Sequence, residues 1–190
     1  MRRRASDGRP QLSIHPARLD SPVEAPELRD VGGAGTIWHA RIEIQPWTGV
    51  TTRDVTYGKG SATVTDSEGR SASAEVEVAR RLTHAGWNAR SLLITELPPE
   101  HWRPYVAMAA DLSALPPRVN DLLGALGRPG APDVFAWREH SGRSQLVAIE
   151  CKRTGRDHVK RVQADWYSRA IAGGWIQRSH LAIVEWSPAR

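Results

Sequence analysis

Asp133, Glu150 and Lys152 have the residue types and the spacing for metal-assisted chemistry at a phosphate group. Asp133 opens the apolar run DVFAW, Glu150 closes the apolar run QLVAIE, and Lys152 follows two positions later. Charged groups at the ends of core strands are costly unless they are paired or bind a cation. A common site for the three side chains would remove much of this cost.

A hairpin would create such a site. The segment REHSGRS joins the two apolar runs and is typical of a turn centred on residues 141–142. Antiparallel pairing around this turn places Phe135 opposite Ala148 and Asp133 opposite Glu150, with Cβ atoms of opposed residues about 4.5–5.5 Å apart. Strand alternation then puts the lysine of ECK on the same face as the glutamate, and the cysteine on the other face.

Two carboxylates this close repel one another, and a divalent cation relieves the repulsion. Mg²⁺ is commonly held by one or two carboxylates together with water and substrate phosphate oxygens. The cation makes a bound water easier to deprotonate, and Lys152 can orient that water and stabilise the developing negative charge. The three residues therefore predict phosphodiester hydrolysis. The alternative is a purely structural one, with an aspartate at a strand start and a surface Glu–Lys pair. This alternative explains any one of the residues well, but it explains all three on one face poorly.

The same residues resemble the PD-(D/E)xK nuclease signature. PD at 132–133 is preceded by Gly130, and ECK follows at 150–152. Beyond the lysine, DHVKRVQADW is similar to the branch called virus-type replication-repair nucleases (VRR-NUC), whose pattern continues with Asp and then Gln-x-x-Trp. Gln163 and Trp166 match the end of that pattern.

The resemblance extends upstream and covers residues 71–187. EVEVARRLTHAGW resembles the first helix of the family, and Glu75 matches the glutamate of that helix. Two features depart from the pattern. Arg153 stands where many members have glycine, and the segment 96–130 has no counterpart, which leaves the choice of substrate open.

The family resemblance implies a restriction-endonuclease-like core, an α/β fold with a mixed four-stranded sheet flanked by helices. It also implies a site for Mg²⁺, with Mn²⁺ able to substitute. The ligands it implies are the side chains of Asp133, Glu150 and Glu75 and the backbone carbonyl of Cys151. Lys152 would assist the attacking water, and Gln163 would position Lys152, the water or the phosphate.

Basic residues follow the lysine closely. Arg153, Arg156, Lys160 and Arg161 are countered nearby only by Asp157, in a chain of net charge +5. Such a run beside a metal site predicts contacts with a nucleic-acid backbone. A solvated helix face is the alternative for Lys160 and Arg161.

The pattern of apolar residues predicts the elements around these residues. A helix is expected after Ser71 or Ser73, either of which can cap it, and before Gly86. A second helix is expected to start at a capping Asp157 and to end at Gly173. The other expected elements are strands at 91–95 and 180–186 and a short helix at 119–126.

The first third of the chain lies outside the resemblance. Residues 1–35 are rich in proline and polar residues and predict a poorly ordered tail, and residues 36–70 predict a β-rich extension of unknown role. The start of the chain lacks the apolar segment of a signal peptide, and the sequence has one cysteine. These features favour the cytoplasm, in a bacterial cell or a phage-infected host, and no membrane contact.

The sequence therefore predicts a metal-dependent DNA nuclease, and its family resemblance favours an endonuclease over an exonuclease. No separate DNA-reading motif is recognisable, so we expect selectivity for a junction, flap or end in replication, repair or recombination. The family includes Holliday junction resolvases, and a homodimer would present two sites to two strands. Two alternatives stay open: a non-catalytic nucleic-acid-binding module on the same scaffold, and a phage-type assembly protein.

Overall fold

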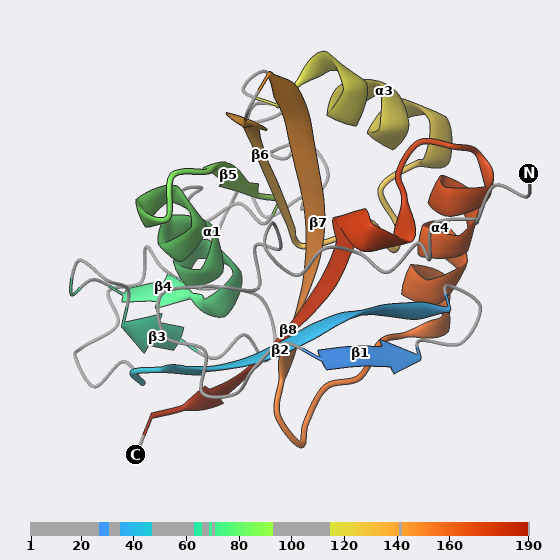
Figure 1. Ribbon diagram of the computed structural model, residues 1–190. Coiled ribbons are helices and arrows are strands. Elements are labelled where there is room, and N and C mark those ends of the chain that lie inside the picture. The colour runs from blue at the N-terminus through green and yellow to red at the C-terminus, as the bar shows by residue number, and fades with distance from the viewer. Residues whose placement is uncertain are drawn as a thin grey trace, which may run out of the picture.

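A mixed β-sheet with helices on both faces forms the body of the molecule (Figure 1). The computed structural model describes residues 27–30, 35–46, 63–65, 69, 71–92, 115–140 and 142–189. The elements, in chain order, are β1 (Glu27–Asp30), β2 (Thr36–Ile44), β3 (Thr63–Thr65), β4 (Ser71–Ser73), α1 (Ala74–His84), β5 (Asn88–Ser91), α3 (Pro117–Leu126), β6 (Val134–His140), β7 (Arg143–Arg153), α4 (Arg161–Ala172), the 3₁₀ turn η6 (Arg178–His180) and β8 (Leu181–Pro188).

Six strands make up the main sheet, in the order β1-β2-β8-β7-β6-β5. The pairs β5–β6, β6–β7 and β1–β2 are antiparallel, whereas β7–β8 and β8–β2 are parallel. Strands β3 and β4 form a separate two-stranded sheet next to α1. The architecture is therefore a mixed α/β fold, as predicted.

The hairpin of β6 and β7 has the predicted register. Phe135 pairs with Ala148 and Trp137 pairs with Leu146. Gly142 adopts φ +69°, a conformation that glycine enters without steric cost. Asp133 lies one residue before β6, next to the pair of Val134 with Ile149, and its carboxylate accepts the N–H of Cys151.

The two faces of the sheet carry separate apolar clusters. On one face, α1 packs against the odd-numbered residues of β7, such as Ile149, and the even-numbered residues of β6. On the other face, α3 and α4 pack against Phe135, Ala148 and Ile183, with the fully buried Trp166 at the centre. Glu150 and Lys152 share the parity of Ala148 and belong to this second face.

The sheet contains two more strands than the four that the family resemblance implies. Strand β2 lies beside β8 with Trp38 opposite Ala182, and β1 adds outside it. The residues expected to form a separate extension therefore begin as part of the main sheet. Neighbouring residues of β2, such as Ile37 and Trp38, are both buried, because helices cover both faces. Part of the stretch expected to be a tail forms β1, and the rest of 1–35, apart from Gly35, lies outside the described residues.

Helix α1 follows the prediction closely. It starts after Ser73, whose hydroxyl accepts the N–H of Val76 at 3.4 Å, and the chain turns away at Gly86 with φ +83°. The strand expected at 91–95 is shifted: β5 ends at Ser91, and residues 93–95 lie outside the described residues.

The prediction that Asp157 caps the next helix is wrong. Helix α4 begins at Arg161, and Lys160 occupies the N-cap position. Asp157 instead accepts the N–H of Arg153 at 3.2 Å, closing the turn that follows β7. None of the helices in the described ranges is long and apolar enough to span a membrane.

Candidate active site

Glu150 is the centre of a buried polar cluster near the end of β7. Its side chain is 1% exposed. The oxygen Oε1 accepts hydrogen bonds from the Lys152 ammonium group and from the Gln163 side-chain amide. The oxygen Oε2 accepts a 2.6 Å hydrogen bond from the hydroxyl of Tyr167. All three donors reach Glu150 on the face of the sheet that α4 covers.

Asp133 is held between the two strands that flank β6. Its Oδ2 accepts the N–H of Cys151 at 2.8 Å, and its backbone carbonyl accepts the N–H of Leu92 at 2.7 Å. The first bond ties the aspartate to β7, and the second ties it to the end of β5. The carboxylate is thereby fixed next to the residue that follows Glu150.

Glu75, in the first turn of α1, approaches the same place. Burial raises its pKa, and repulsion from Glu150 adds to the increase. The pKa of Asp133 lies well above the usual value, first because of burial and then because of repulsion from Glu150 and Glu75. The three carboxyl groups therefore share one electrostatic environment, in which negative charge is only partly compensated.

Lys152 provides the compensating positive charge. Burial acts to lower the pKa of Lys152, but the attraction of Glu150 and the hydrogen bond to it raise the pKa above the usual value. The raised pKa keeps the ammonium group charged although the side chain is buried and has little access to water. A positive charge in such a place can stabilise negative charge that develops on a phosphoryl group.

Gln163 connects the cluster to the start of α4. Its side-chain oxygen accepts the N–H of Lys160 at 2.8 Å, and its amide nitrogen donates to Glu150. The helix is anchored further by Trp166, whose indole N–H donates to the carbonyl of Gly127 at 2.8 Å. One glutamine thus caps the helix and binds the central carboxylate, and its predicted role toward Lys152, the water or the phosphate stays a prediction.

Tyr167 is a residue of the cluster that the sequence analysis missed. It lies four residues after Gln163, on the same face of α4, and is fully buried against Trp166 with the two rings nearly perpendicular. Helical spacing from Gln163 is the signal that points to it. A buried tyrosine in a helix is also typical of a simple core residue, so spacing alone does not reveal the bond to Glu150.

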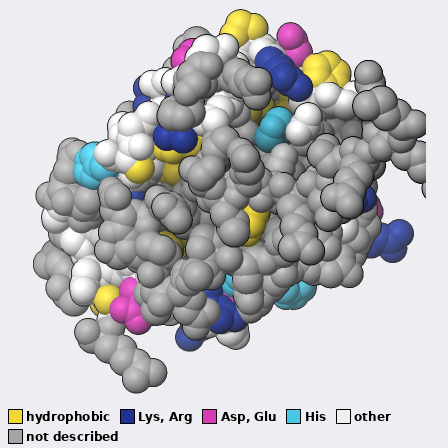
Figure 2. Space-filling model, in the orientation of Figure 1, with side chains coloured by type: hydrophobic (Ala, Val, Ile, Leu, Met, Phe, Trp, Pro, Cys, Tyr) yellow, Lys and Arg dark blue, Asp and Glu magenta, His cyan; other side chains and the backbone are white. Residues whose placement is uncertain are grey.

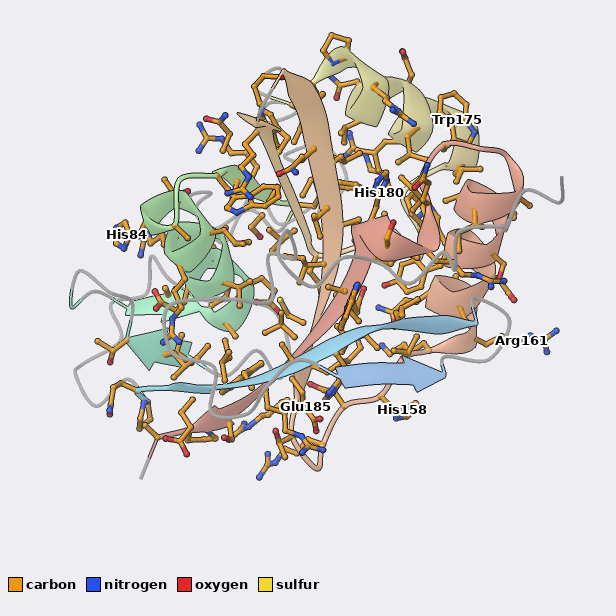
Figure 3. The ribbon with its side chains drawn as sticks, viewed as in Figure 1. His84, His158, Arg161, Trp175, His180 and Glu185 are labelled. Carbon is orange, nitrogen blue, oxygen red and sulfur yellow. The ribbon has the colours of Figure 1, made fainter. Side chains whose placement is uncertain are left out.

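The structure does not gather the four basic residues expected to bind nucleic acid. Arg153 points to the α1 face, opposite to Lys152, where its guanidinium lies 5.3 Å from the ring centre of Trp186. Arg156, Lys160 and Arg161 are exposed, and Figure 3 shows Arg161 projecting away from the fold. Arg161 pairs with Asp165 of its own helix at 3.7 Å, in a fully solvated position.

Lys and Arg side chains appear at several separate places on the face seen in Figure 2. The described Lys and Arg side chains on that face do not join into one continuous patch. The expected phosphate contacts of Arg153, Arg156, Lys160 and Arg161 therefore stay a prediction.

Other carboxylates near the site have structural partners. Glu77, which is buried, accepts a 2.7 Å bond from Arg81 on the next turn of α1. Glu185, in β8, accepts a 2.9 Å bond from the buried His39 of β2, so this pair fastens two parallel strands. Both glutamates therefore have structural partners outside the polar cluster of Glu150.

The residues of the cluster fit a hard cation by their chemistry. Asp133, Glu150, Glu75 and the carbonyl of Cys151 offer only oxygen donors, which Mg²⁺ and Mn²⁺ prefer. Within the described ranges, however, no three His, Cys, Asp or Glu side chains are arranged as the ligands of one ion. Oε1 of Glu150 is occupied by Lys152 and Gln163, so coordination by this oxygen requires a local rearrangement.

Comparisons of the chain with protein-family models, with curated proteins and with solved structures give no match.

Proposed function

We propose that the chain is a metal-dependent nuclease that hydrolyses DNA phosphodiester bonds on a restriction-endonuclease-like core. The observation that carries the proposal is the contact between Lys152 and the buried Glu150, with Asp133 fixed beside them by the N–H of Cys151. A structural role alone does not need carboxyl groups whose pKa values are raised by burial and, in addition, by repulsion from one another.

Each residue has a role that follows from its contacts. Asp133, Glu150 and the carbonyl of Cys151 would hold Mg²⁺ or Mn²⁺, with Glu75 close by. When bound, the ion supplies charge stabilisation at a phosphoryl oxygen and lowers the pKa of a water. Lys152 orients that water and stabilises the negative charge that develops on the phosphate.

Gln163 acts through Glu150 rather than on the substrate. Its amide fixes the carboxylate, while its oxygen fixes the start of α4. A site that must hold reacting atoms in line depends on such support, because small displacements are costly for catalysis.

The proposed substrate is DNA of a particular shape, such as a junction, flap or end. Base sequence is read by contacts to base edges, whereas a site built for phosphate and metal reads the backbone. One cluster cuts one strand, so symmetric cutting of two strands would require two copies of the chain, most simply a two-fold homodimer.

The test is a cleavage assay with labelled linear, flapped, forked and four-way DNAs. We expect cleavage with Mg²⁺ or Mn²⁺, none with EDTA, and loss of cleavage in Asp133→Asn, Glu150→Gln and Lys152→Ala, with DNA binding largely retained. Full activity in EDTA would refute the proposed chemistry. DNA binding without cleavage under any metal would favour the non-catalytic binding module, and neither activity would favour the assembly protein.

A further inference from the structure

Positive charge collects at the segment that joins α4 to β8. The turn η6 contains Arg178 and His180, and Arg118 of α3 reaches the same segment with a 2.7 Å bond from Nη2 to the carbonyl of Trp175. Within the described ranges, no ion pair involves Arg118, Arg178 or His180. The acidic residue closest to Arg118 in the sequence is Asp121, one turn later on α3, and it forms no such pair either. The charge of this segment is therefore not cancelled by a described carboxylate.

Both arginines are instead held by contacts with the main chain. Arg118 is fixed by the carbonyl of Trp175. The guanidinium group of Arg178 lies against Gly35, where a Cβ atom would stand 3.1 Å from Cζ of the arginine. Both side chains are exposed. A contact with a neutral main-chain group orients the planar guanidinium but leaves its charge in place, so an anion that binds there meets donors that are already ordered.

The pKa of His180 shows the sign of the charge at this place. Burial lowers this pKa, and the positive charge of Arg118 lowers it further. The Nδ1 atom of His180 accepts the N–H of Gln177 at 3.2 Å, so the neutral ring carries its proton on Nε2 and has a donor there. Figure 3 shows His180 between α3 and the start of β8. The three side chains Arg118, Arg178 and His180 are called the η6 basic surface below.

Strand β8 connects the η6 basic surface to the polar cluster of Glu150. His180 directly precedes β8, and Ile183, three residues later, pairs with Glu150. Three residues of a strand span about 10 Å, which is also the rise of about three base pairs of DNA. A DNA backbone that enters the cluster can therefore reach the η6 basic surface a few nucleotides away.

We propose that the η6 basic surface is a second contact site for the DNA backbone, beside the bond that is cut. This inference rests on the proposed function, and it adds where the substrate lies on the protein beyond the catalytic cluster. Phosphate groups fit the surface because the guanidinium fork donates in pairs to phosphate oxygens. Such contacts bind the backbone without reading base sequence, as recognition of DNA by its shape requires.

DNA binding without cleavage measures the proposed contacts. The assay uses the full chain in the Asp133→Asn background with Mg²⁺, titrated into a labelled four-way DNA and followed by fluorescence anisotropy at several salt concentrations. Arg118→Gln and Arg178→Gln should each weaken binding about threefold to tenfold. Each should also reduce the slope of log K against log salt concentration by about 0.9, the value for one lost phosphate contact.

Arg90→Gln is the matched control. It also removes one exposed positive charge, but from β5, the strand at the far end of the main sheet. We expect it to leave both the affinity and the salt dependence unchanged. Equal losses in Arg90→Gln and in the two variants of the η6 basic surface would reveal a general effect of net charge and would overturn the proposal.

Arg178→Lys separates a lost charge from a disturbed fold. It keeps the positive charge and removes the planar group that lies against Gly35. The salt dependence should stay close to that of the unaltered surface, whereas equal losses in the lysine and glutamine variants would show a structural role and contradict the proposal. Thermal unfolding of each variant checks that the chain is folded.

The remaining outcomes distinguish this inference from the proposed function. If the protein binds DNA and neither Arg118→Gln nor Arg178→Gln weakens the binding, the η6 basic surface is refuted and the nuclease proposal stands. If binding depends on both arginines but the unaltered protein cleaves no DNA with Mg²⁺ or Mn²⁺, the nuclease proposal is refuted and the contact surface stands. Absence of DNA binding would overturn both.

Discussion

Gly130 lies directly against the main chain of Val162, so that a Cβ atom on residue 130 would stand 2.3 Å from the Val162 carbonyl oxygen. Gly130 also has φ +87°, in the region that side chains disfavour. The contact presses the loop that leads to Asp133 onto the first turn of α4, which carries Gln163. Two halves of the cluster are thus placed relative to each other by the absence of one side chain.

Gly130→Ala should lower stability and activity together. The backbone conformation alone costs about 1–2 kcal/mol for an L-residue, and the clash with a backbone carbonyl adds to it, since helix α4 must shift. The control is Gly86→Ala, which has a similar φ of +83° but open space around the new Cβ atom. Thermal unfolding and cleavage rate are measured for both. Equal effects of the two substitutions would show that the close approach to Val162 has no consequence.

Asp133→Asn should stabilise the protein at neutral pH. The pKa of Asp133 is raised on folding above its ordinary value of 3.8, so the folded chain holds a proton that the unfolded chain has already released. Stability is therefore lost as the pH rises from about 4 through the raised pKa, and each pKa unit of the shift costs about 1.4 kcal/mol. Asparagine keeps an acceptor for the N–H of Cys151 and removes the charge.

Chemical denaturation at a series of pH values measures this effect. The difference in the free energy of unfolding between Asp133→Asn and the unaltered protein should grow from acid to neutral pH. It should vanish below the pKa of the unfolded aspartate. Mg²⁺ should reduce this stability difference at neutral pH, because an ion bound at Asp133 in the folded state stabilises the unaltered protein. An advantage that is constant with pH would contradict the raised pKa.

Gln163→Ala should impair cleavage more than stability. It removes the acceptor for the Lys160 N–H, which is worth about 1 kcal/mol as a helix cap. It also frees the Glu150 carboxylate from one of its donors, and a displacement of this group by about 1 Å can lower the rate about a hundredfold. The rate at saturating DNA and metal is compared with thermal unfolding, with Ser168→Ala as the control. A loss of activity no larger than the loss of folded protein would argue against a positioning role.

Glu77→Ala should lower stability without impairing cleavage. The buried carboxylate holds Arg81 at 2.7 Å, and Arg81 also donates to the carbonyl of Glu43 in β2 at 3.1 Å. Removing one partner of a buried pair costs about 3 kcal/mol or more. The unfolding free energy should fall, while cleavage per folded molecule stays unchanged. A selective loss of cleavage would mean that Glu77 belongs to the active site.

Local patterns were sufficient for the hairpin and for the residues within it. A turn at residues 141–142 and a period of two fix every pairing from Phe135 to Ala148, and they bring Lys152 to the face of Glu150. The same alternation excludes Arg153 from that face, a consequence that its position beside the lysine in the sequence conceals.

Long-range contacts decide what the sequence could not. Asp157 was the predicted cap of α4, but the helix starts after Lys160, where Gln163 binds both the N–H of Lys160 and the carboxylate of Glu150. The parallel pairing of β2 with β8 has no local signal, because it depends on an edge that exists only when β8 is in place. The role of Tyr167 likewise depends on a partner in another element.

The placement of β8 between β7 and β2 has a consequence for synthesis of the chain. Strand β2 pairs residue by residue with β8, yet β8 leaves the ribosome after β2 and after every residue of the cluster. Before β8 is synthesised, β1 is the only neighbour of β2 in the main sheet as described. The apolar side chains of β2 therefore lack their contacts with β8 until that strand is in place. Pairings of this kind form slowly and expose the nascent chain to aggregation, so we expect the main sheet to be completed only once β8 has been synthesised.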